Sequence, residues 1–308
     1  MMKKLLIFGY SGFVGPYLAK EFANDGYEVF GCDINEPVGN DVTFFKCNIL
    51  EFSDVKNTVS KILPDVIINL AAISSVGQSW NIPQTTISVN VIGTINIMES
   101  IRLNNIKPKV LLVGSSEEYV NSDEKIDESS PLNANNPYGI SKITQEMFAE
   151  VYRQRLGIKI YCVRSFNHTG IGQRDSFVLP SFCKQVAEIE KSGKDGTIYV
   201  GNLEVYRDFS DVRDMVVAYK LVINSDDDSI IYNIGSGKAY SLKDLLDYIV
   251  SLSKQKISVK IDKDRYRPVD NKIICCNNNM ICNELDWIPK YSIKDTLKEM
   301  YLYFLTKE

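Results

Sequence analysis

The stretch Leu5-Leu6-Ile7-Phe8-Gly9-Tyr10-Ser11-Gly12-Phe13-Val14-Gly15 decides the fold of this chain. Its four leading apolar residues predict a buried strand, and three glycines then follow as G-x-x-G-x-x-G at the opening of a helix. Glycines let the backbone approach a pyrophosphate, which the free N–H groups of the helix start stabilise. A tight strand-to-helix turn without a ligand is the alternative interpretation. The residues expected to contact a dinucleotide in this turn are Gly9, Gly12, Phe13, Val14 and Gly15.

Asp33 lies at the end of the second predicted strand. A carboxylate at this place can accept both ribose hydroxyls of an adenosine and would repel a 2'-phosphate. No arginine follows Asp33 in Ile34-Asn35-Glu36, so NAD(H) is the expected cofactor, with NADP(H) as a second choice. A surface aspartate in a turn is the alternative.

Short apolar runs alternate with helical patterns through the first half of the chain, which predicts an α/β fold with a doubly wound parallel sheet. The expected strands are residues 4–8, 28–32, 43–47, 66–71, 110–114 and 159–163. Apolar residues at helical spacing predict amphipathic helices over 87–101 and 140–151. After about residue 170 the elements become shorter and more mixed, which indicates a smaller mixed α/β lobe. Residues 231–234 are expected to form a strand that returns to the first sheet.

The composition excludes several classes of protein. With 308 residues, 44% of them apolar and 24% charged, the chain can bury a sizeable core. A net charge of -4 without a dense basic run argues against nucleic acid as a partner. No stretch reaches the roughly 18 apolar residues of a membrane span, so no membrane is expected. Seven cysteines without a C-x-x-C pair favour reduced thiols in a cytoplasm, and the single histidine, His168, argues against a metal cluster or a Ser-His-Asp hydrolase.

Tyr138-Gly-Ile-Ser-Lys142 places the pattern Y-x-x-x-K in the second amphipathic helix. A spacing of four brings the phenol and the ammonium onto one face. A nearby cation favours the phenolate and so eases proton transfer from Tyr138. The pattern occurs by chance in many helices, but here it accompanies the glycine turn and a serine pair, Ser115-Ser116, at the end of the fifth strand.

Over essentially its whole length, the sequence resembles the extended short-chain dehydrogenase/reductase family, whose members act on nucleotide sugars and have a Rossmann domain. The motifs that carry this resemblance are the glycine turn and residues 69–72, 114–119, 136–142 and 207–214. Within the family the chain is most similar to GDP-4-keto-6-deoxymannose reductases, through residues 164–173, 177–185 and 200–204. Two departures are Ile171, where a proline is usual, and Asn48, where an aspartate often meets the adenine.

The resemblance implies a role for each site residue. Ser115 would hold the substrate oxygen, Tyr138 would donate the proton, and Lys142 would bind the nicotinamide ribose. These roles agree with the chemistry of ketone reduction, because a ketone that receives hydride becomes an alkoxide, which hydroxyl donors stabilise. Further cofactor contacts are expected at Asn48, Leu70, Ala71 and Ala72, beside Tyr138 and Lys142. Contacts to the sugar nucleotide are expected at Glu117, Asn167, Asn202, Arg207 and Arg267.

Glu117 leaves two activities open. In related 4,6-dehydratases a glutamate two residues after the Ser/Thr abstracts the proton beside the carbonyl, although reductases that resemble this chain also carry it. It can instead bind sugar hydroxyls or cap its loop. For Arg207 and Arg267 the alternative to substrate binding is a surface salt bridge, and for His168 it is a structural role.

The expected function is NAD(P)H-dependent reduction of the 4-keto group of a nucleotide-linked 4-keto-6-deoxyhexose, most simply GDP-4-keto-6-deoxymannose. A GDP-mannose 4,6-dehydratase and a 4-epimerase are the enzymatic alternatives, and net oxidation of NADH separates the reductase from both. A dinucleotide-sensing regulator would need neither Ser115, Tyr138 nor Lys142. From the change of pattern along the chain we expect residues 1–168 with 210–235 to bind the cofactor and residues 169–209 with 236–308 to bind the nucleotide sugar. The resemblance implies that two copies pair through a four-helix bundle.

Overall fold

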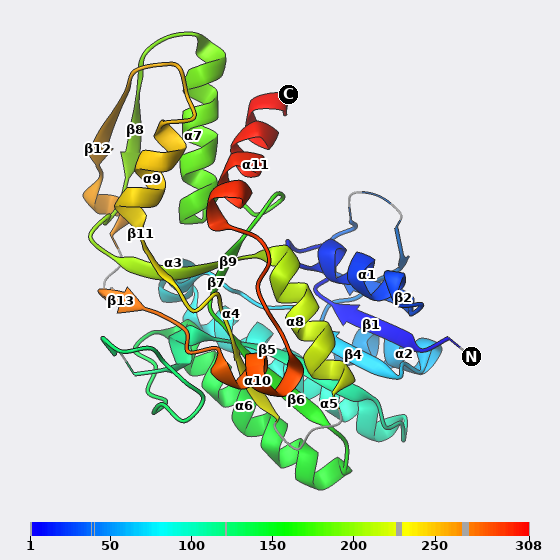
Figure 1. Ribbon diagram of the computed structural model, residues 1–308. Helices are drawn as coiled ribbons and strands as arrows, with labels where there is room; N and C mark the ends of the chain where they lie inside the picture. The colour runs from blue at the N-terminus through cyan, green and yellow to red at the C-terminus, as the bar shows by residue number, and fades with distance from the viewer. Residues whose placement is uncertain are drawn as a thin grey trace.

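A seven-stranded parallel sheet forms the centre of the molecule, with strand order β10-β6-β5-β4-β1-β2-β3 (Figure 1). The computed structural model describes residues 2–37, 39, 41–120, 122–225, 230–266 and 271–307. β1 lies between β4 and β2, so the chain moves outward from β1 in both directions, as in a doubly wound fold. The predicted fold class is confirmed. The strands are β1 (Lys4–Phe8), β2 (Glu28–Asp33), β3 (Thr43–Lys46), β4 (Val66–Asn69), β5 (Lys109–Ser115), β6 (Ile160–Ser165) and β10 (Ile231–Ile234).

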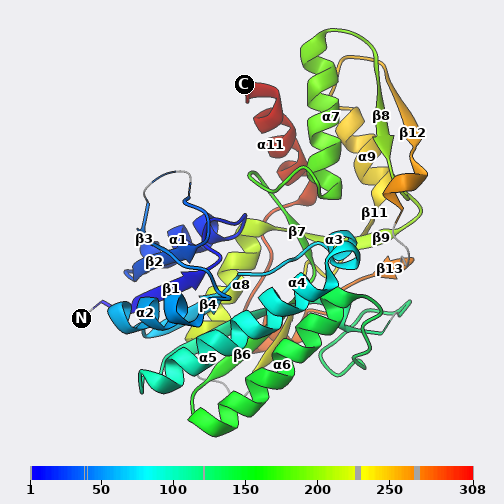
Figure 2. The ribbon, with the colours of Figure 1, turned by 180° about the vertical axis from the view of Figure 1, so that it is seen from behind.

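Helices cover both faces of this sheet. Successive residues of a strand point to opposite faces, and here both sets are apolar. Leu5 and Ile7 of β1 pack with α1 (Gly15–Asn24) and α8 (Val212–Asn224) on one face. Leu6 and Phe8 pack on the other face with α2 (Phe52–Ile62), α5 (Gly93–Leu103) and α6 (Pro137–Leu156). Figure 2 shows α5 and α6 side by side on the second face.

The predicted helix over residues 87–101 is longer in the structure and contains a wide turn. It runs through α4 (Pro83–Ile87), a π-helical segment η1 (Ser88–Ile92) and α5 without a break. A π-turn changes the direction of the side chains that follow it and is frequent at functional sites.

The second lobe stands above the sheet in the view of Figure 1. Its core lies between α7 (Val178–Ser192), α9 (Leu242–Val250) and α11 (Ile293–Thr306). A two-stranded sheet, β8 (Gly196–Val200) with β12 (Ile257–Ile261), covers α7. The remaining elements of the chain are β7 (Asn167–Thr169), β9 (Tyr206–Asp211), β11 (Ala239–Ser241), β13 (Ile273–Ile274), α3 (Val76–Asn81), η2 (Ser116–Glu118), η3 (Lys263–Arg265) and α10 (Asn279–Leu285).

A small sheet, β11-β9-β13 with β7 beside β9, joins the lobes. Asp208 on β9 is completely buried and accepts hydrogen bonds from the backbone N–H groups of Ser236 at 2.8 Å, Gly237 at 2.9 Å and Cys276 at 3.1 Å. These bonds connect three separate segments, so the position of β9 relative to the main sheet is fixed.

The apolar stripe of α6 faces away from the sheet. Ile140, Met147 and Val151 are 48%, 65% and 56% exposed, whereas the inward face carries polar residues such as Ser141 and Lys142. The described helices include none with a stretch long and apolar enough to cross a bilayer.

Candidate active site

The glycine turn lies at the carboxyl end of β1 and touches the loop that follows β4. Gly9 has a φ of +79°, and a Cβ there would lie 2.5 Å from the backbone nitrogen of Ala71. A Cβ on Gly15 would collide with the Tyr10 carbonyl. Both glycines are therefore required for the close packing of turn, loop and helix.

The start of α1 has no side-chain cap. Val14 occupies the N-cap position without a side-chain hydrogen bond, and the first turn of the helix contains Pro16 and no acidic residue. The N–H groups of such a helix start are free to bind a phosphate, and the partial positive charge there favours it. The glycine turn, with Gly12 and Phe13 in its middle, therefore fits the pyrophosphate of a dinucleotide.

Asp33 lies at the end of β2 beside this turn. Its Oδ2 accepts the Ser11 N–H at 3.2 Å, and its Oδ1 accepts the Asn35 N–H at 3.3 Å. The carboxylate is thereby oriented toward the glycine turn with acceptor capacity left for a ligand. Asn48 follows β3, and its Oδ1 accepts the Leu50 N–H at 3.1 Å.

The loop after β4 holds the other expected cofactor contacts. The Leu70 N–H donates to the Phe8 carbonyl at 2.9 Å, and the Ala71 N–H donates to Oδ1 of Asn69 at 3.1 Å. Ala72 follows in the same partly buried loop. These bonds keep the loop against the glycine turn.

Ser115 and Tyr138 meet at the carboxyl end of β5. Ser115 is 6% exposed and Tyr138 is 8% exposed, and their side chains are hydrogen-bonded. Burial raises the pKa of Tyr138, and the hydrogen bond with Ser115 acts in the opposite direction. The phenol is therefore protonated at neutral pH and has a proton to donate.

Lys142 lies next to Tyr138 on the inward face of α6. Its Nζ is 5.9 Å from the centre of the Tyr138 ring, and it donates to the Val113 carbonyl at 2.6 Å and to Oε1 of Gln145 at 3.0 Å. Burial lowers the pKa of Lys142 to about 8. The hydrogen bonds therefore fix the position of the ammonium group, and burial brings its pKa closer to neutral pH.

Glu117 is positioned by the start of α6. Nδ2 of Asn136 donates to Oε2 of Glu117 at 2.9 Å, while Oδ1 of Asn136 caps the helix by accepting the Gly139 N–H at 2.9 Å. A Cβ on Gly139 would collide with the Glu117 carbonyl. The structure therefore brings Ser115, Glu117, Tyr138 and Lys142 together.

The expected substrate residues are more dispersed. Asn167 lies on β7 opposite Phe209 of β9. Asn202 lies in the second lobe, where its Oδ1 accepts the Glu204 N–H at 2.9 Å. Arg207 is 6% exposed, and its Nη1 donates to the Tyr206 carbonyl at 2.8 Å. Arg267 lies outside the described residues.

His168 stacks on Phe13 of the glycine turn, with ring centres 6.1 Å apart and planes 9° apart. Its Nδ1 is 3.2 Å from the Phe166 carbonyl, and burial lowers its pKa. The imidazole is therefore a neutral ring that supports the turn from the side of β7.

Sequence reasoning missed Asn90, and it gave no role to Asn136 within the motif 136–142. Nδ2 of Asn90 donates to Oγ of Ser141 at 2.8 Å, and its Oδ1 accepts the Ile73 N–H at 2.8 Å, so it links α6 to the loop after β4. Asn136 precedes Pro137, and this pair is a recognisable helix start. Asn90 has no such local signal because its partners lie far away in sequence.

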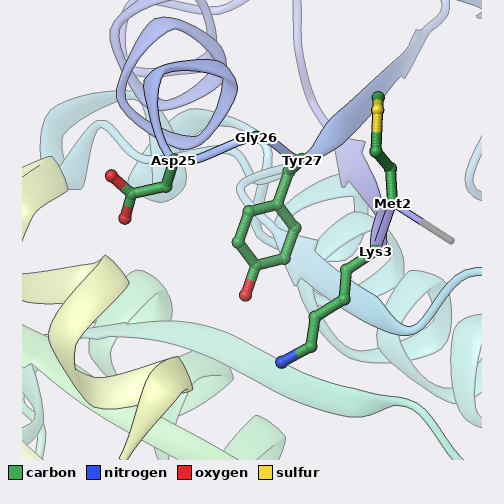
Figure 3. Close-up of a pocket in the computed structure, with 5 residues that line it drawn as sticks. All are labelled: Met2, Lys3, Asp25, Gly26 and Tyr27. Carbon is green, nitrogen blue, oxygen red and sulfur yellow. The ribbon is translucent and has the colours of Figure 1, made fainter.

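A surface hollow elsewhere on the molecule takes no part in this arrangement. Figure 3 shows its lining of Met2, Lys3, Asp25, Gly26 and Tyr27, where β1 begins and α1 ends. This is the amino-terminal edge of the sheet, whereas the glycine turn and Ser115 lie at the carboxyl ends of their strands. In the described parts of the chain, no group of three His, Cys, Asp or Glu side chains could hold a metal ion.

A glycine turn beside a buried Ser115–Tyr138–Lys142 set, on a doubly wound sheet with a second lobe, defines an extended short-chain dehydrogenase/reductase. The family model described as GDP-mannose 4,6 dehydratase matches residues 6–300, so the chain belongs to this family and the predicted family resemblance is confirmed.

The relatives carry several activities within this family. A GDP-6-deoxy-D-mannose reductase of Pseudomonas aeruginosa is 26% identical over 97% of this chain and 96% of its own. A GDP-6-deoxy-D-talose 4-dehydrogenase of Aggregatibacter actinomycetemcomitans is 31% identical over 97% of each chain. A GDP-mannose 4,6-dehydratase of Vibrio cholerae is 24% identical over 97% of this chain and 93% of its own.

Solved structures share the fold. The structure of RMD from Pseudomonas aeruginosa complexed with NADPH superimposes with a TM-score of 0.88, covering 100% of both chains at 24% identity. A UDP-glucose 4-epimerase of Thermus thermophilus in complex with NAD gives a TM-score of 0.87 at 23% identity, covering 99% of this chain and 100% of the other.

Proposed function

We propose that this protein is an NAD(P)H-dependent reductase of the 4-keto group of a nucleotide-linked 4-keto-6-deoxyhexose, most specifically GDP-4-keto-6-deoxymannose. The observation that carries the proposal is the hydrogen-bonded Ser115–Tyr138 pair with Lys142 beside it, at the strand ends that carry the glycine turn. The relatives named as a GDP-sugar reductase and a GDP-sugar 4-dehydrogenase support a reaction that interconverts a hydroxyl and a ketone at C4.

The chain's own residues have distinct parts in this reaction. A nicotinamide dinucleotide bound on the glycine turn supplies the hydride that reduces the keto carbon. Ser115 holds the keto oxygen, and Tyr138 donates its phenolic proton to that oxygen as negative charge develops. Lys142 lowers the energy of the resulting phenolate, which regains its proton from solvent. All three side chains are buried, which strengthens the electrostatic interactions among them.

We assign the cofactor by the environment of Asp33. Its carboxylate accepts two backbone N–H groups and keeps acceptor capacity for ribose hydroxyls, and its charge would repel the 2'-phosphate of NADPH. NADH is therefore the proposed cofactor, with NADPH used less efficiently. Residues 1–168 with 210–235 are proposed as the cofactor domain, and 169–209 with 236–308 as the nucleotide-sugar lobe; the pairing of β10 with β6 supports this division.

A GDP-mannose 4,6-dehydratase is the second candidate, because of Glu117. Dehydration needs a base to remove the C5 proton, and a carboxylate held by Asn136 next to Tyr138 is suited to that role. The family description and several relatives carry the dehydratase name.

We infer that two copies associate through α5 and α6. Ile140, Met147 and Val151 on α6 and Leu103 on α5 are exposed, and these two helices lie side by side (Figure 2). Covering such apolar side chains stabilises an isologous dimer. A cytoplasmic location is proposed because all seven cysteines are free thiols.

One experiment tests the proposed function. The purified protein is mixed with GDP-4-keto-6-deoxymannose and NADH or NADPH, cofactor oxidation is followed by absorbance, and the product is analysed by NMR. Stoichiometric oxidation with formation of a 4-hydroxyl is expected. Conversion of GDP-mannose without net cofactor oxidation would instead support the dehydratase, and no turnover of either sugar would overturn both candidates.

A further inference from the structure

The side chain of Glu118 is completely buried beneath the candidate active site. Its Oε1 accepts the backbone N–H of Ser115 at 2.6 Å, which closes the turn at the end of β5. A Cβ on Gly114 would lie 2.5 Å from this oxygen, so glycine at 114 leaves the space that the carboxyl group occupies. The carboxyl group of Glu118 is therefore bonded directly to the backbone of Ser115.

The second oxygen of Glu118 has no such partner. Among the described residues, Oε2 is buried and receives no hydrogen bond, and Nε of Arg164 lies 3.9 Å from it. The carboxyl group of Glu146 lies close enough to Glu118 for a hydrogen bond when one of the two carboxyls is protonated. Arg164 is bound in a bidentate manner by Glu146, through Nε to Oε1 at 2.9 Å and Nη2 to Oε2 at 2.7 Å. An ionised Glu118 would be a buried charge with a single hydrogen bond, which is far more costly than a buried neutral acid.

We propose that Glu118 is a positioning residue for Ser115 and that it functions as an uncharged carboxylic acid, with Oε1 as the carbonyl acceptor and the proton on Oε2. The positioning role depends on the proposed function of Ser115. The charged and titratable groups that face Glu118 are Glu146, Lys142 and Tyr138 of α6 and Arg164 and Cys162 of β6. Burial, and then the Glu146 charge, raise the pKa of Glu118 well above its ordinary value, and this supports the neutral form.

Infrared difference spectroscopy tests the protonation state without any substrate. The parent at neutral pH should show the C=O stretching band of a buried protonated carboxylic acid, and Glu118→Gln should remove it. Glu190→Gln is the matched control, because Glu190 also accepts a backbone N–H, from Lys254 at 2.8 Å, but its own hydrogen bonds lower its pKa. A parent spectrum without an acid band that depends on Glu118 would overturn the neutral form.

Kinetics test the positioning role. Glu118→Gln keeps a neutral acceptor of the same shape, so kcat should stay within about threefold of the parent. Glu118→Leu leaves the Ser115 N–H unpaired, and kcat should fall by at least about tenfold with little change in KM for the cofactor, as expected for a misplaced reacting group. Glu128→Leu is the control, because Glu128 accepts the Asn233 N–H at 2.7 Å in a comparable bond to a different strand. Its kcat should not change.

Each other outcome has a definite meaning. Equal losses in Glu118→Gln and Glu118→Leu would show that the negative charge is needed and would overturn the neutral-acid proposal. Parent-like kcat in Glu118→Leu would overturn the positioning role. If the leucine variant does not fold, Glu118→Asp replaces it, because its carboxyl is too short to reach the Ser115 N–H. A parent that turns over no sugar would overturn the proposed function and the positioning role, while the infrared band still reports the protonation state.

Discussion

Nζ of Lys142 lies 5.9 Å from the centre of the Tyr138 ring and is fixed there by hydrogen bonds to the Val113 carbonyl and Gln145. Among the described contacts, Nζ of Lys142 makes no hydrogen bond to the Tyr138 oxygen. The cation therefore lies beside the phenol and is not bonded to it. This leaves the phenol free to hydrogen-bond with Ser115 and donate its proton, while Lys142 acts through its charge.

Replacing Tyr138 with phenylalanine should lower kcat by about 10²-fold or more, because the proton donor is lost while the ring packing stays. Steady-state kinetics give kcat, and fluorescence titration of NADH should show unchanged affinity. Tyr152→Phe is the control, since Tyr152 lies on the same helix and its hydroxyl donates to Oε1 of Glu99 at 2.8 Å, away from Ser115. Activity within a few fold of the parent in Tyr138→Phe would exclude Tyr138 as the acid.

The pH dependence of kcat/KM for the cofactor should have an alkaline limb near pH 8. Burial lowers the pKa of Lys142 to about 8, so the ammonium is charged below this pH and neutral above it. Neutral Lys142 cannot stabilise the Tyr138 phenolate, and kcat/KM of the free enzyme should fall as the pH rises through this value. A profile that falls only near the ordinary lysine value of about 10.4 would contradict this assignment.

Asp33→Ser should shift the cofactor preference toward NADPH. The substitution removes the charge that repels a 2'-phosphate and also removes acceptors for the ribose hydroxyls. The ratio of kcat/KM for NADH to that for NADPH is the measurement. Asp65→Ser serves as control, because Oδ2 of Asp65 accepts the Lys4 N–H at 2.8 Å where β1 begins. An unchanged ratio in Asp33→Ser would rule out Asp33 as the ribose contact.

Glu117→Gln distinguishes reduction from dehydration. A reductase needs no base at C5, so this variant should retain activity and lose at most about 3 kcal/mol of transition-state stabilisation from a hydrogen bond to a charged group. A dehydratase would lose nearly all product with its base. Conversion of GDP-mannose to the 4-keto-6-deoxy sugar by the parent, abolished in Glu117→Gln, would identify the dehydratase.

Met147→Glu should dissociate the proposed dimer. Met147 is 65% exposed on α6, and a carboxylate buried in a helix-to-helix interface lacks a partner. Sedimentation velocity at micromolar concentration should show the parent as a dimer and the variant as a monomer. Ile288→Glu is the control, because Ile288 is 71% exposed in the loop after α10. This variant should keep the oligomeric state of the parent. A monomeric parent would exclude this interface.

The sequence by itself determined the parts of the site that depend on local geometry. The glycine turn follows from one strand-to-helix connection, and Gly9 has the positive φ that such a turn uses. A spacing of four residues brought Tyr138 and Lys142 onto one face, because helix periodicity needs no tertiary contact. The parallel sheet followed from the alternation of apolar runs and helical patterns.

Only the tertiary structure decided which side of each helix is buried and which distant residues meet. Ile140, Met147 and Val151 form an apolar stripe that would be expected to face the core. In the structure it faces outward, because the inward face of α6 carries the polar residues of the site. Asn90 reaches Ser141 and Ile73 only because α6 and the loop after β4 fold against η1. The burial of Glu118 depends in the same way on the approach of Glu146 and Arg164 from two other elements. Burial and long-range hydrogen bonds are properties of the packed chain, so no local pattern encodes them.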